Sequence, residues 1–326
     1  MTFVRPVLKL LAAAAVATSS AGAFAQANAY PNHTVTIVVP FAAGGPADIY
    51  ARYLAQRLGA EFKQPFVVDD RPGAGSIIGT NIVAKSAPDG YTLLMMSNTH
   101  TVNETLMPKK PFTLMKDFVG IAPVNYSDLM LVVNPSVPAK TLADLIKLAK
   151  AHPGKLNYAS SGTGTPYHMA GELFKHMAGV AITHIPYRGS SGARTGVVGG
   201  QVDMMFDAVT TMAQMAKDGK VRALATTGLT RNPITPDVPT VNEAGVPKYE
   251  ATIWLGMMAP KGTPPAIVQK LNTAIRKIVA DPQVKAQWQQ QGAVPMSMTV
   301  PEFDKYLRAD IAKWATIVKI SGAKPD

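Results

Sequence analysis

Short apolar runs separated by segments of helical periodicity recur along the chain. Runs of this length, bounded by glycine, proline or polar clusters, are typical of buried strands. They lie at residues 35–40, 66–69, 91–97, 129–134, 156–160, 182–186, 202–207 and 222–226. Strands that alternate with helices favour parallel sheets covered by helices on both faces, so the predicted fold class is α/β.

Helix ends are marked by capping signals. Thr141 and Asp144 have the spacing of a capping box, and Pro153-Gly154 predicts the end of the same helix. A helix near the C-terminus is predicted from apolar residues that recur on one face. These residues are Phe303, Leu307, Ile311, Trp314 and Val318.

Two extended segments, 120–133 and 252–260, are predicted to be strands that cross between two lobes. On this interpretation the first lobe comprises residues 27–124 and 253–326, and the second is the inserted block 125–252. The chain, with its 326 residues, is also longer than a single core usually accommodates. Ligands of such folds bind beyond the carboxyl ends of the strands, which here face the cleft between the lobes.

The segment 37–52 predicts an anion-binding site. It reads as a strand, a loop with Gly44 and Gly45, and a helix that begins at Pro46. The free N–H groups and the positive end of such a helix suit a carboxylate. The loop contains no serine, cysteine or histidine, which indicates binding without catalysis.

Asp48 would lie in the first turn of this helix, where a carboxylate complements the helix dipole but repels an anionic ligand. The favoured interpretation is a structural acid that faces its own backbone. The alternative is an acceptor for a ligand ammonium, a ligand hydroxyl or a water molecule.

A second glycine loop, 158–165, joins a strand to the helix that contains His168. It offers hydroxyl and N–H groups together, so the two loops could hold one carboxylate from opposite lobes. A plain turn capped by Thr165 is the alternative. His168 lies one turn further on, where it could reach a ligand or simply be packed.

The segment 71–79 has glycines spaced G-x-G-x-x-x-G, a weak match to a dinucleotide-binding fingerprint. No acidic residue ends a second strand about 20 residues on, which argues against a nucleotide. The other interpretation places Gly75 at a third helix terminus at the edge of the cleft.

The N-terminus predicts export. Arg5 and Lys9 precede an apolar run, and residues 23–25 form an A-x-A cleavage site, so residues 1–25 are interpreted as a signal peptide cleaved near Ala25. An uncleaved membrane anchor is the alternative. The predicted location is the periplasm.

Composition narrows the function further. Removal of the leader, which carries two cations and no acid, lowers the net charge from +11 to +9. The cations are dispersed, which favours small anions or a generally basic surface over nucleic acid. The chain has no cysteine, and its six histidines show no metal-ligand spacing, so neither a metal nor a cofactor is expected.

Catalytic motifs are not evident. Ser160 and Ser161 have no base at a recognisable spacing, and no G-x-S-x-G elbow occurs. Asp203 and Asp207 would lie on the same side of a strand, and a pair of carboxylates is typical of glycosidases. A sugar-binding cleft, however, needs several exposed tryptophans, and the chain has only three. The chain is therefore predicted not to be an enzyme.

Nearly the whole chain beyond the leader resembles the Bug-type solute receptors of tripartite tricarboxylate transporters. The resemblance rests on several motifs. They are VVPFAAGGPAD (38–48), DRPGAGSIIG (70–79), APDGYTLL (87–94), LVVNPSVPAK (131–140), GKLNYASSGTGTPYHMAGELFK (154–175), HIPYRGS (184–190), GGQVDMMFD (199–207), TPDVPTVNEAG (235–245) and APKGTPP (259–265).

The resemblance implies a two-lobed periplasmic binding protein of the Venus flytrap type, type II-like, which binds a small carboxylate. The implied partner is the membrane permease of a tripartite transporter, and the implied receptor is a monomer. Carried over by position, the implied ligand-binding residues are Phe41, Ala43, Gly44, Asp48, Ser161, Gly164, Thr165, His168, Tyr187 and Asp207.

The identity of the acid stays open. Dicarboxylates, tricarboxylates, acidic amino acids and aromatic acids all occur among family ligands. Ala42, Ala43, Ala47 and Arg188 depart from residues common in the family. A receptor that presents its ligand to a sensor kinase, or an exported hydrolase, are the alternative functions.

Overall fold

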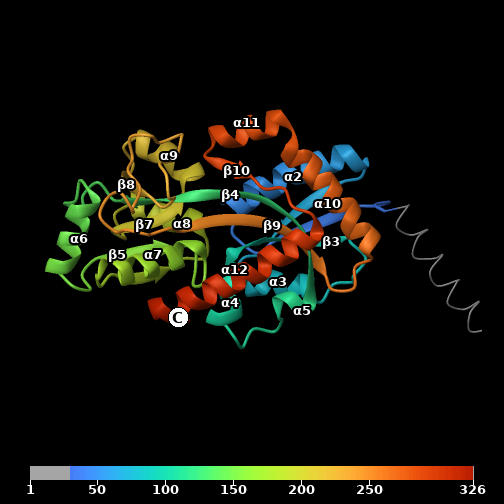
Figure 1. The fold of residues 1–326 in the computed structure, drawn as a ribbon, viewed down its shortest axis with the longest axis horizontal. Coiled ribbons are helices and arrows are strands. Elements are labelled where there is room, and N and C mark those ends of the chain that lie inside the picture. Colours follow the sequence, from blue (N-terminus) through green and yellow to red (C-terminus); the bar gives the residue numbers. More distant parts are fainter. Residues whose placement is uncertain (1–29, 326) are drawn as a thin grey trace, which may run out of the picture.

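A computed structural model describes residues 30–325 of the chain (Figure 1). Its strands are β1 (Val35–Val39), β2 (Phe66–Asp70), β3 (Thr92–Ser97), β4 (Phe118–Val133), β5 (Asn157–Ser160), β6 (Thr183–Pro186), β7 (Met204–Ala208), β8 (Arg222–Thr226), β9 (Thr252–Pro260) and β10 (Ala293–Pro295). Its helices are α2 (Pro46–Phe62), α3 (Ile77–Ala84), α4 (Asn98–Leu106), α5 (Leu114–Asp117), α6 (Leu142–Ala151), α7 (Pro166–Ala178), α8 (Ser190–Val198), α9 (Val209–Lys217), α10 (Pro265–Ala280), α11 (Pro282–Gln290) and α12 (Val300–Ser321).

Two long strands join two lobes, as the sequence predicts. The strand order is β2-β1-β3-β9-β4-β7-β5-β6, with β8 and β10 also paired to β4. The strands β1, β2 and β3 are parallel, as are β5, β6 and β7, whereas β4 and β9 run antiparallel to their neighbours. In Figure 1, β4 and β9 lie side by side along the length of the molecule, between the lobe with β1–β3 and the lobe with β5–β8.

The predicted α/β, two-lobed fold with two crossover strands is confirmed. Each predicted strand occurs within a few residues of its expected position, and the run at 129–134 is the second half of β4. The exact lobe boundaries, 27–124 with 253–326 and 125–252, remain a prediction. The predicted signal peptide lies outside the described residues.

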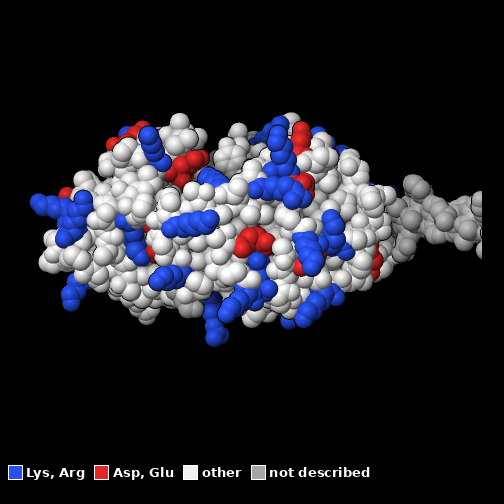
Figure 2. All heavy atoms as spheres, turned by 60° about the horizontal axis from the view of Figure 1, so that its bottom comes forward, with Lys and Arg blue, Asp and Glu red and all other residues white. Residues whose placement is uncertain are grey.

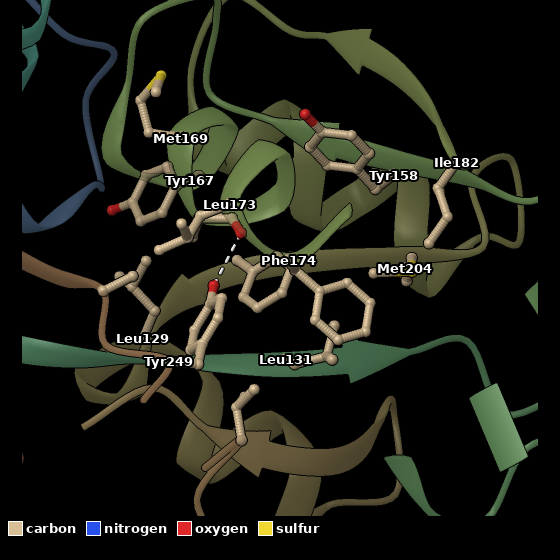
Figure 3. Close-up of a cluster of buried hydrophobic side chains, with 14 of the residues drawn as sticks. Leu129, Leu131, Tyr158, Tyr167, Met169, Leu173, Phe174, Ile182, Met204 and Tyr249 are labelled. Carbon is tan, nitrogen blue, oxygen red and sulfur yellow. Dashed lines mark hydrogen bonds between the residues drawn. The ribbon is translucent and has the colours of Figure 1, made fainter. Parts of the chain in front are cut away.

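Separate apolar clusters fill the lobes. In the second lobe, Leu129 and Leu131 of β4 pack against Phe174 of α7 and against Tyr249 (Figure 3). The Tyr249 hydroxyl donates a hydrogen bond to the carbonyl of Ala170, 2.7 Å away. The body of α7 is thereby fixed on the sheet, which sets the position of its N-terminus at the cleft.

The C-terminal helix α12 packs on both lobes. Phe303 and Leu307 pack with Trp254 of β9, whereas Trp314 and Val318 belong to the apolar cluster of the second lobe. The helix begins with a capping box between Thr299 and Glu302. The predicted apolar face is correct, but the sequence pattern did not indicate that this face touches both lobes.

Among residues 30–325, no helix combines the length and the apolar character needed to cross a membrane. Figure 2 shows lysine and arginine side chains scattered over the face in view, without one dominant patch.

Gly256 of the crossover strand β9 has no side chain, which leaves room for Phe303 of α12. A Cβ atom at Gly256 would lie 2.6 Å from the ring of Phe303, so Gly256→Ala should destabilise the fold by roughly 1–3 kcal/mol through overpacking. Urea denaturation measures this cost. In a Phe303→Leu background the same substitution should cost less, because the ring that meets the new methyl group is gone. Equal costs in the two backgrounds would show that this contact is not the reason for the glycine.

Candidate functional site

Four helices begin around one small chamber between the lobes, the inner chamber. Its volume is about 30 Å³. Its walls are Phe41, Ala42, Gly45, Pro46, Ala47, Ser97, Thr99, Ser161, Pro166, Tyr167, Gly189, Ser190, Ile253 and Leu255. The helices are α2 and α4 from the first lobe and α7 and α8 from the second. Each of them follows a strand of a parallel set, β1, β3, β5 or β6.

Among residues 30–325, none that lines the inner chamber carries a charged side chain. Each helix start instead presents backbone N–H groups and the positive end of its dipole, and at α4 the Ser97 hydroxyl accepts from one of these N–H groups, that of Thr99. Hydroxyl groups of serine, threonine and tyrosine add further donors. A volume of this size holds about one carboxylate group or one or two water molecules. The chamber is therefore chemically suited to an anionic group of a ligand.

The start of α2 is shaped by Pro46 at its first position, which supplies the backbone angle that a helix needs there. The N–H of Gly44 donates to Asp48 Oδ2 at 2.8 Å, and Asp48 Oδ1 lies 2.6 Å from Arg52 Nε. Asp48 is buried and lies off the chamber wall. This arrangement matches the favoured interpretation of a structural acid that faces its own backbone.

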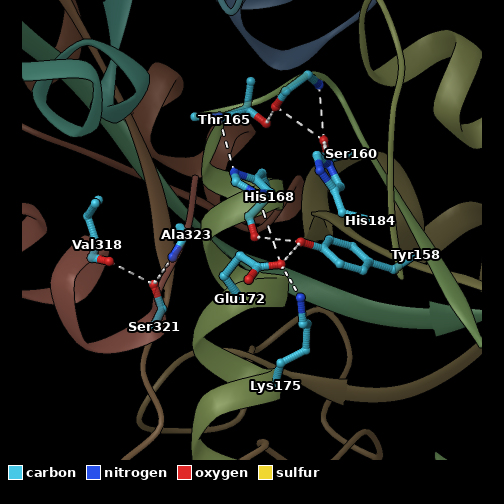
Figure 4. A network of polar contacts seen from close by, with 12 residues as sticks. Tyr158, Ser160, Thr165, His168, Glu172, Lys175, His184, Val318, Ser321 and Ala323 are labelled. Carbon is cyan, nitrogen blue, oxygen red and sulfur yellow. Dashed lines mark hydrogen bonds and ion pairs between the residues drawn. The ribbon is translucent and has the colours of Figure 1, made fainter. Parts of the chain in front are cut away.

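The start of α7 is held in place by a network of polar contacts (Figure 4). The N–H of Gly164 donates to His168 Nδ1 at 3.1 Å, and the Thr165 hydroxyl donates to the carbonyl of Gly162 at 2.6 Å. The His168 ring stacks on His184 with 4.2 Å between ring centroids. His168 is buried and lies off the wall of the inner chamber, and its ring braces the loop.

A serine and a histidine that the sequence does not pair are neighbours in this network. Ser160 Oγ lies 2.7 Å from His184 Nε2. Ser160 is fully buried, and its hydroxyl exchanges hydrogen bonds with the N–H and the carbonyl of Gly162. The pair therefore supports the loop that precedes α7.

The start of α4 also uses its side chains for capping. Ser97 accepts a hydrogen bond from the N–H of Thr99, and His100 Nδ1 accepts one from the N–H of Ser97 at 3.2 Å. Burial lowers the pKa of His100 to about 4, the backbone of Ser97 acts to raise it, and the nearby Lys110 acts to lower it. At neutral pH His100 is therefore uncharged and can accept the capping bond.

The lobes touch directly at the cleft. The Ser191 hydroxyl of α8 donates to the Ala43 carbonyl at 2.9 Å, and Arg194 Nη2 donates to the Gly44 carbonyl at 2.9 Å. A Cβ at Gly189 would lie 2.3 Å from the Cβ of Ala42. The absence of a side chain at this glycine therefore permits the close approach of the two loops.

Arg194 also lies near a buried acid. Its Nε is 3.5 Å from Asp207 Oδ2, and the Asp207 side chain is fully buried. Burial raises the pKa of Asp207 to about 6, although Arg194, the N–H of Ala208 and the hydroxyl of Tyr167 all act to lower it. Arg194 thus contacts both the buried Asp207 of its own lobe and the Gly44 carbonyl of the opposite lobe.

A larger cavity, the outer cavity, opens beyond the inner chamber at the mouth of the cleft. Its volume is about 810 Å³. It lies between residues 72–77 and 107–111 of the first lobe and residues 161–163, Thr165 and residues 186–189 of the second. Both cavities share the wall residues Phe41, Ala42, Ser161 and Gly189.

The residues predicted to bind a ligand fall into two groups. Those on a cavity wall are Phe41, Gly75, Ser161, Thr165 and Tyr187. Those off both walls are Ala43, Gly44, Asp48, Gly164, His168 and Asp207. The second group makes hydrogen bonds or ion pairs that hold the loops or join the lobes.

The helix starts of α4 and α8 were not predicted as part of the site. Ser97 and Thr99 directly follow the strand β3, and Gly189 and Ser190 follow β6. The same signal that identified the first two loops, a strand followed by small or hydroxyl residues and a helix, occurs at both places. It was weaker there, because neither segment has a paired glycine or a proline at the helix start.

Comparisons with known proteins agree on one family. Residues 50–323 match the family described as tripartite tricarboxylate transporter family receptor. BugT of Bordetella pertussis is 37% identical over 311 residues, which cover 95% of this chain and 95% of BugT.

Two solved structures are similar along their whole length. Rpa4515 of R. palustris with adipate has a TM-score of 0.88 and 34% identity, covering 91% of this chain and 100% of that chain. MatC from Rhodopseudomonas palustris with bound malate has a TM-score of 0.84 and 32% identity, covering 89% of this chain and 100% of that chain.

The raised pKa of Asp207 predicts a pH-dependent stability. The folded state binds the proton more tightly than the unfolded chain, so the stabilisation is complete below about pH 4 and is lost as the pH rises through about 6. Relative to Asp207→Asn, the free energy of unfolding of the wild type should fall by roughly 3 kcal/mol between pH 4 and pH 7. Urea denaturation of both proteins at several pH values measures the difference. A constant difference across this range would contradict the assignment.

Proposed function

The chain belongs to the tripartite tricarboxylate transporter receptor family, and on that premise we propose that it captures a small organic carboxylate between its lobes for delivery to a tripartite membrane transporter. Receptors of this family are periplasmic solute-binding proteins. Similar proteins of known structure hold adipate and malate, both carboxylates, which supports a carboxylate as the ligand here.

The observation that carries the proposal is the meeting of four helix starts at one uncharged chamber. Because the described wall residues offer N–H and hydroxyl donors and include no acidic side chain, the chamber favours an anion over a cation. A carboxylate would exchange its water shell for fixed donors. The side chains of Phe41, Ile253 and Leu255 on the chamber wall would contact the carbon atoms next to the carboxylate.

The predicted site residues then divide by role. Phe41, Ser161 and Thr165 would contact the ligand or the water molecules around it, and Tyr187 and Gly75 would line the path outward. The residues off the walls would keep the helix starts in place. His168 would act through the N–H of Gly164.

Closure of the lobes would couple binding to delivery. The inner chamber takes its walls from both lobes, so a ligand that touches both makes more contacts when the lobes are together. The contacts of Ser191 and Arg194 with the opposite loop would add to the closed state. A membrane permease would then recognise the closed form of a monomeric receptor.

Calorimetry with a panel of carboxylic acids tests the proposal directly. Protein that has been unfolded, stripped of ligand and refolded should bind at least one acid with micromolar or tighter affinity, about 8 kcal/mol of binding free energy. The amides or methyl esters of the same acid should not bind, because they lack the anionic group. Silence with every acid would overturn the proposal.

A charge placed on the chamber wall should abolish binding. Ser161→Asp would bring a carboxylate to the wall, so the affinity for the best acid of the panel should fall more than 100-fold. Ser161→Asn, of similar size but neutral, should keep affinity within about tenfold. Thermal melting of both variants checks that they are folded. Unchanged binding by a folded Ser161→Asp protein would place the anion elsewhere.

A further inference from the structure

The segment that follows the last helix, residues 322–325, is called here the C-terminal tail, and it ends at the mouth of the cleft. Pro325 forms part of the wall of the outer cavity, together with Met107 and Lys109 of the first lobe and Thr163 and Thr165 of the second. The outer cavity and the inner chamber share wall residues. A ligand that reaches the chamber through the outer cavity therefore moves past Pro325.

The end of α12 directs the tail to this place. The helix ends at Ser321, and Gly322 follows with a φ of 68°, a left-handed conformation that glycine adopts without steric cost. The N–H of Ala323 donates to Ser321 Oγ at 3.4 Å, and Ala323 packs against the apolar cluster of the second lobe. Figure 4 shows Ser321 and Ala323 beside α7, which α12 contacts. The tail is thus anchored on the second lobe.

Beyond Ala323 the tail is held only weakly. Lys324 and Pro325 are exposed, and neither forms a hydrogen bond or an ion pair with another residue of the described range 30–325. A proline has no N–H group to donate. The end of the tail can therefore move away from the cavity without breaking a hydrogen bond between described residues.

The wall opposite the tail belongs to the other lobe. Residues 72–77 and 107–111 of the first lobe line the same cavity as Pro325, whereas Ala323 packs on the second lobe. Closure of the lobes would bring these two sides together. The tail would then narrow the entrance at the moment when the ligand becomes enclosed.

We propose that the C-terminal tail is a gate at the mouth of the cleft, which slows both the entry and the exit of the ligand. The tail would lie across the outer cavity for most of the time and swing outward for passage. The gate presupposes the proposed function, because it regulates ligand exchange at the same site. Slow exit would prolong the loaded, closed form that a permease recognises.

A chain that ends at Ala323 tests the gate, because it keeps the anchor and lacks the part of the tail that lines the cavity. The probes are isotope-labelled adipate, malate, citrate, glutamate and benzoate, of which those that bind the wild type in calorimetry are used. Rapid filtration after mixing or chasing gives kon and koff. Both rates should rise about threefold or more, because the barrier at the mouth is lower, while Kd should stay within about twofold.

Two full-length variants complete the test. Lys324→Gln/Asp326→Asn removes the same charged side chains as the truncation but keeps the length of the tail, so both rates should stay within about twofold of the wild type. Pro325→Trp enlarges the side chain on the cavity wall, so both rates should fall about threefold or more. Thermal melting checks that all three variants are folded.

The possible failures are distinguishable. Unchanged rates in a truncated chain that binds an acid normally would refute the gate and leave the proposed function intact. Weaker binding caused by faster exit alone would show that the tail holds the bound ligand and does not control its passage. An equal effect of the charge variant and the truncation would assign the effect to charge. A wild type that binds none of the acids would refute the proposed function together with the gate.

Discussion

The fold depends on what satisfies the backbone N–H groups at the starts of four helices. The first turn of any helix leaves N–H groups without partners inside the helix, and a capping side chain, water or an anion must accept from them. Here α2, α4, α7 and α8 all begin at one chamber of about 30 Å³, which leaves room for very little water. A carboxylate would satisfy several of these groups at once. The same geometry disfavours a cation.

Close approach of the lobes is what makes the chamber small, and it relies on the absence of side chains. Gly75 and Gly189 lie where a Cβ would meet the opposite lobe, at the Thr163 carbonyl and at Ala42. Polar contacts from Arg194 reach across the same boundary. Asp48 and His168, which the sequence predicts as ligand contacts, accept hydrogen bonds from the N–H groups of Gly44 and Gly164 in the two glycine loops. Binding and closure therefore draw on the same elements.

Local patterns predicted the strands, the crossover segments and the two glycine-rich helix starts, because each has a signature within a few residues. The direction of a side chain is not local. His168 lies on the helix that follows the second loop, as expected, yet its ring turns under the loop toward His184, a residue from the next strand. Asp207 lies at the end of its strand, as expected, but packing by neighbouring elements buries it completely. The helix starts after Ser97 and Gly189 join the site only because the sheet order brings their strands to the cleft.

A crystal structure of the protein with a carboxylate that calorimetry shows to bind tests the central claim most directly. The account predicts a carboxylate group in the inner chamber, about 2.7–3.1 Å from N–H or hydroxyl donors at helix starts of both lobes. A ligand whose charged group contacts one lobe alone, or pairs with a cationic side chain outside the chamber while the chamber holds only water, would contradict it.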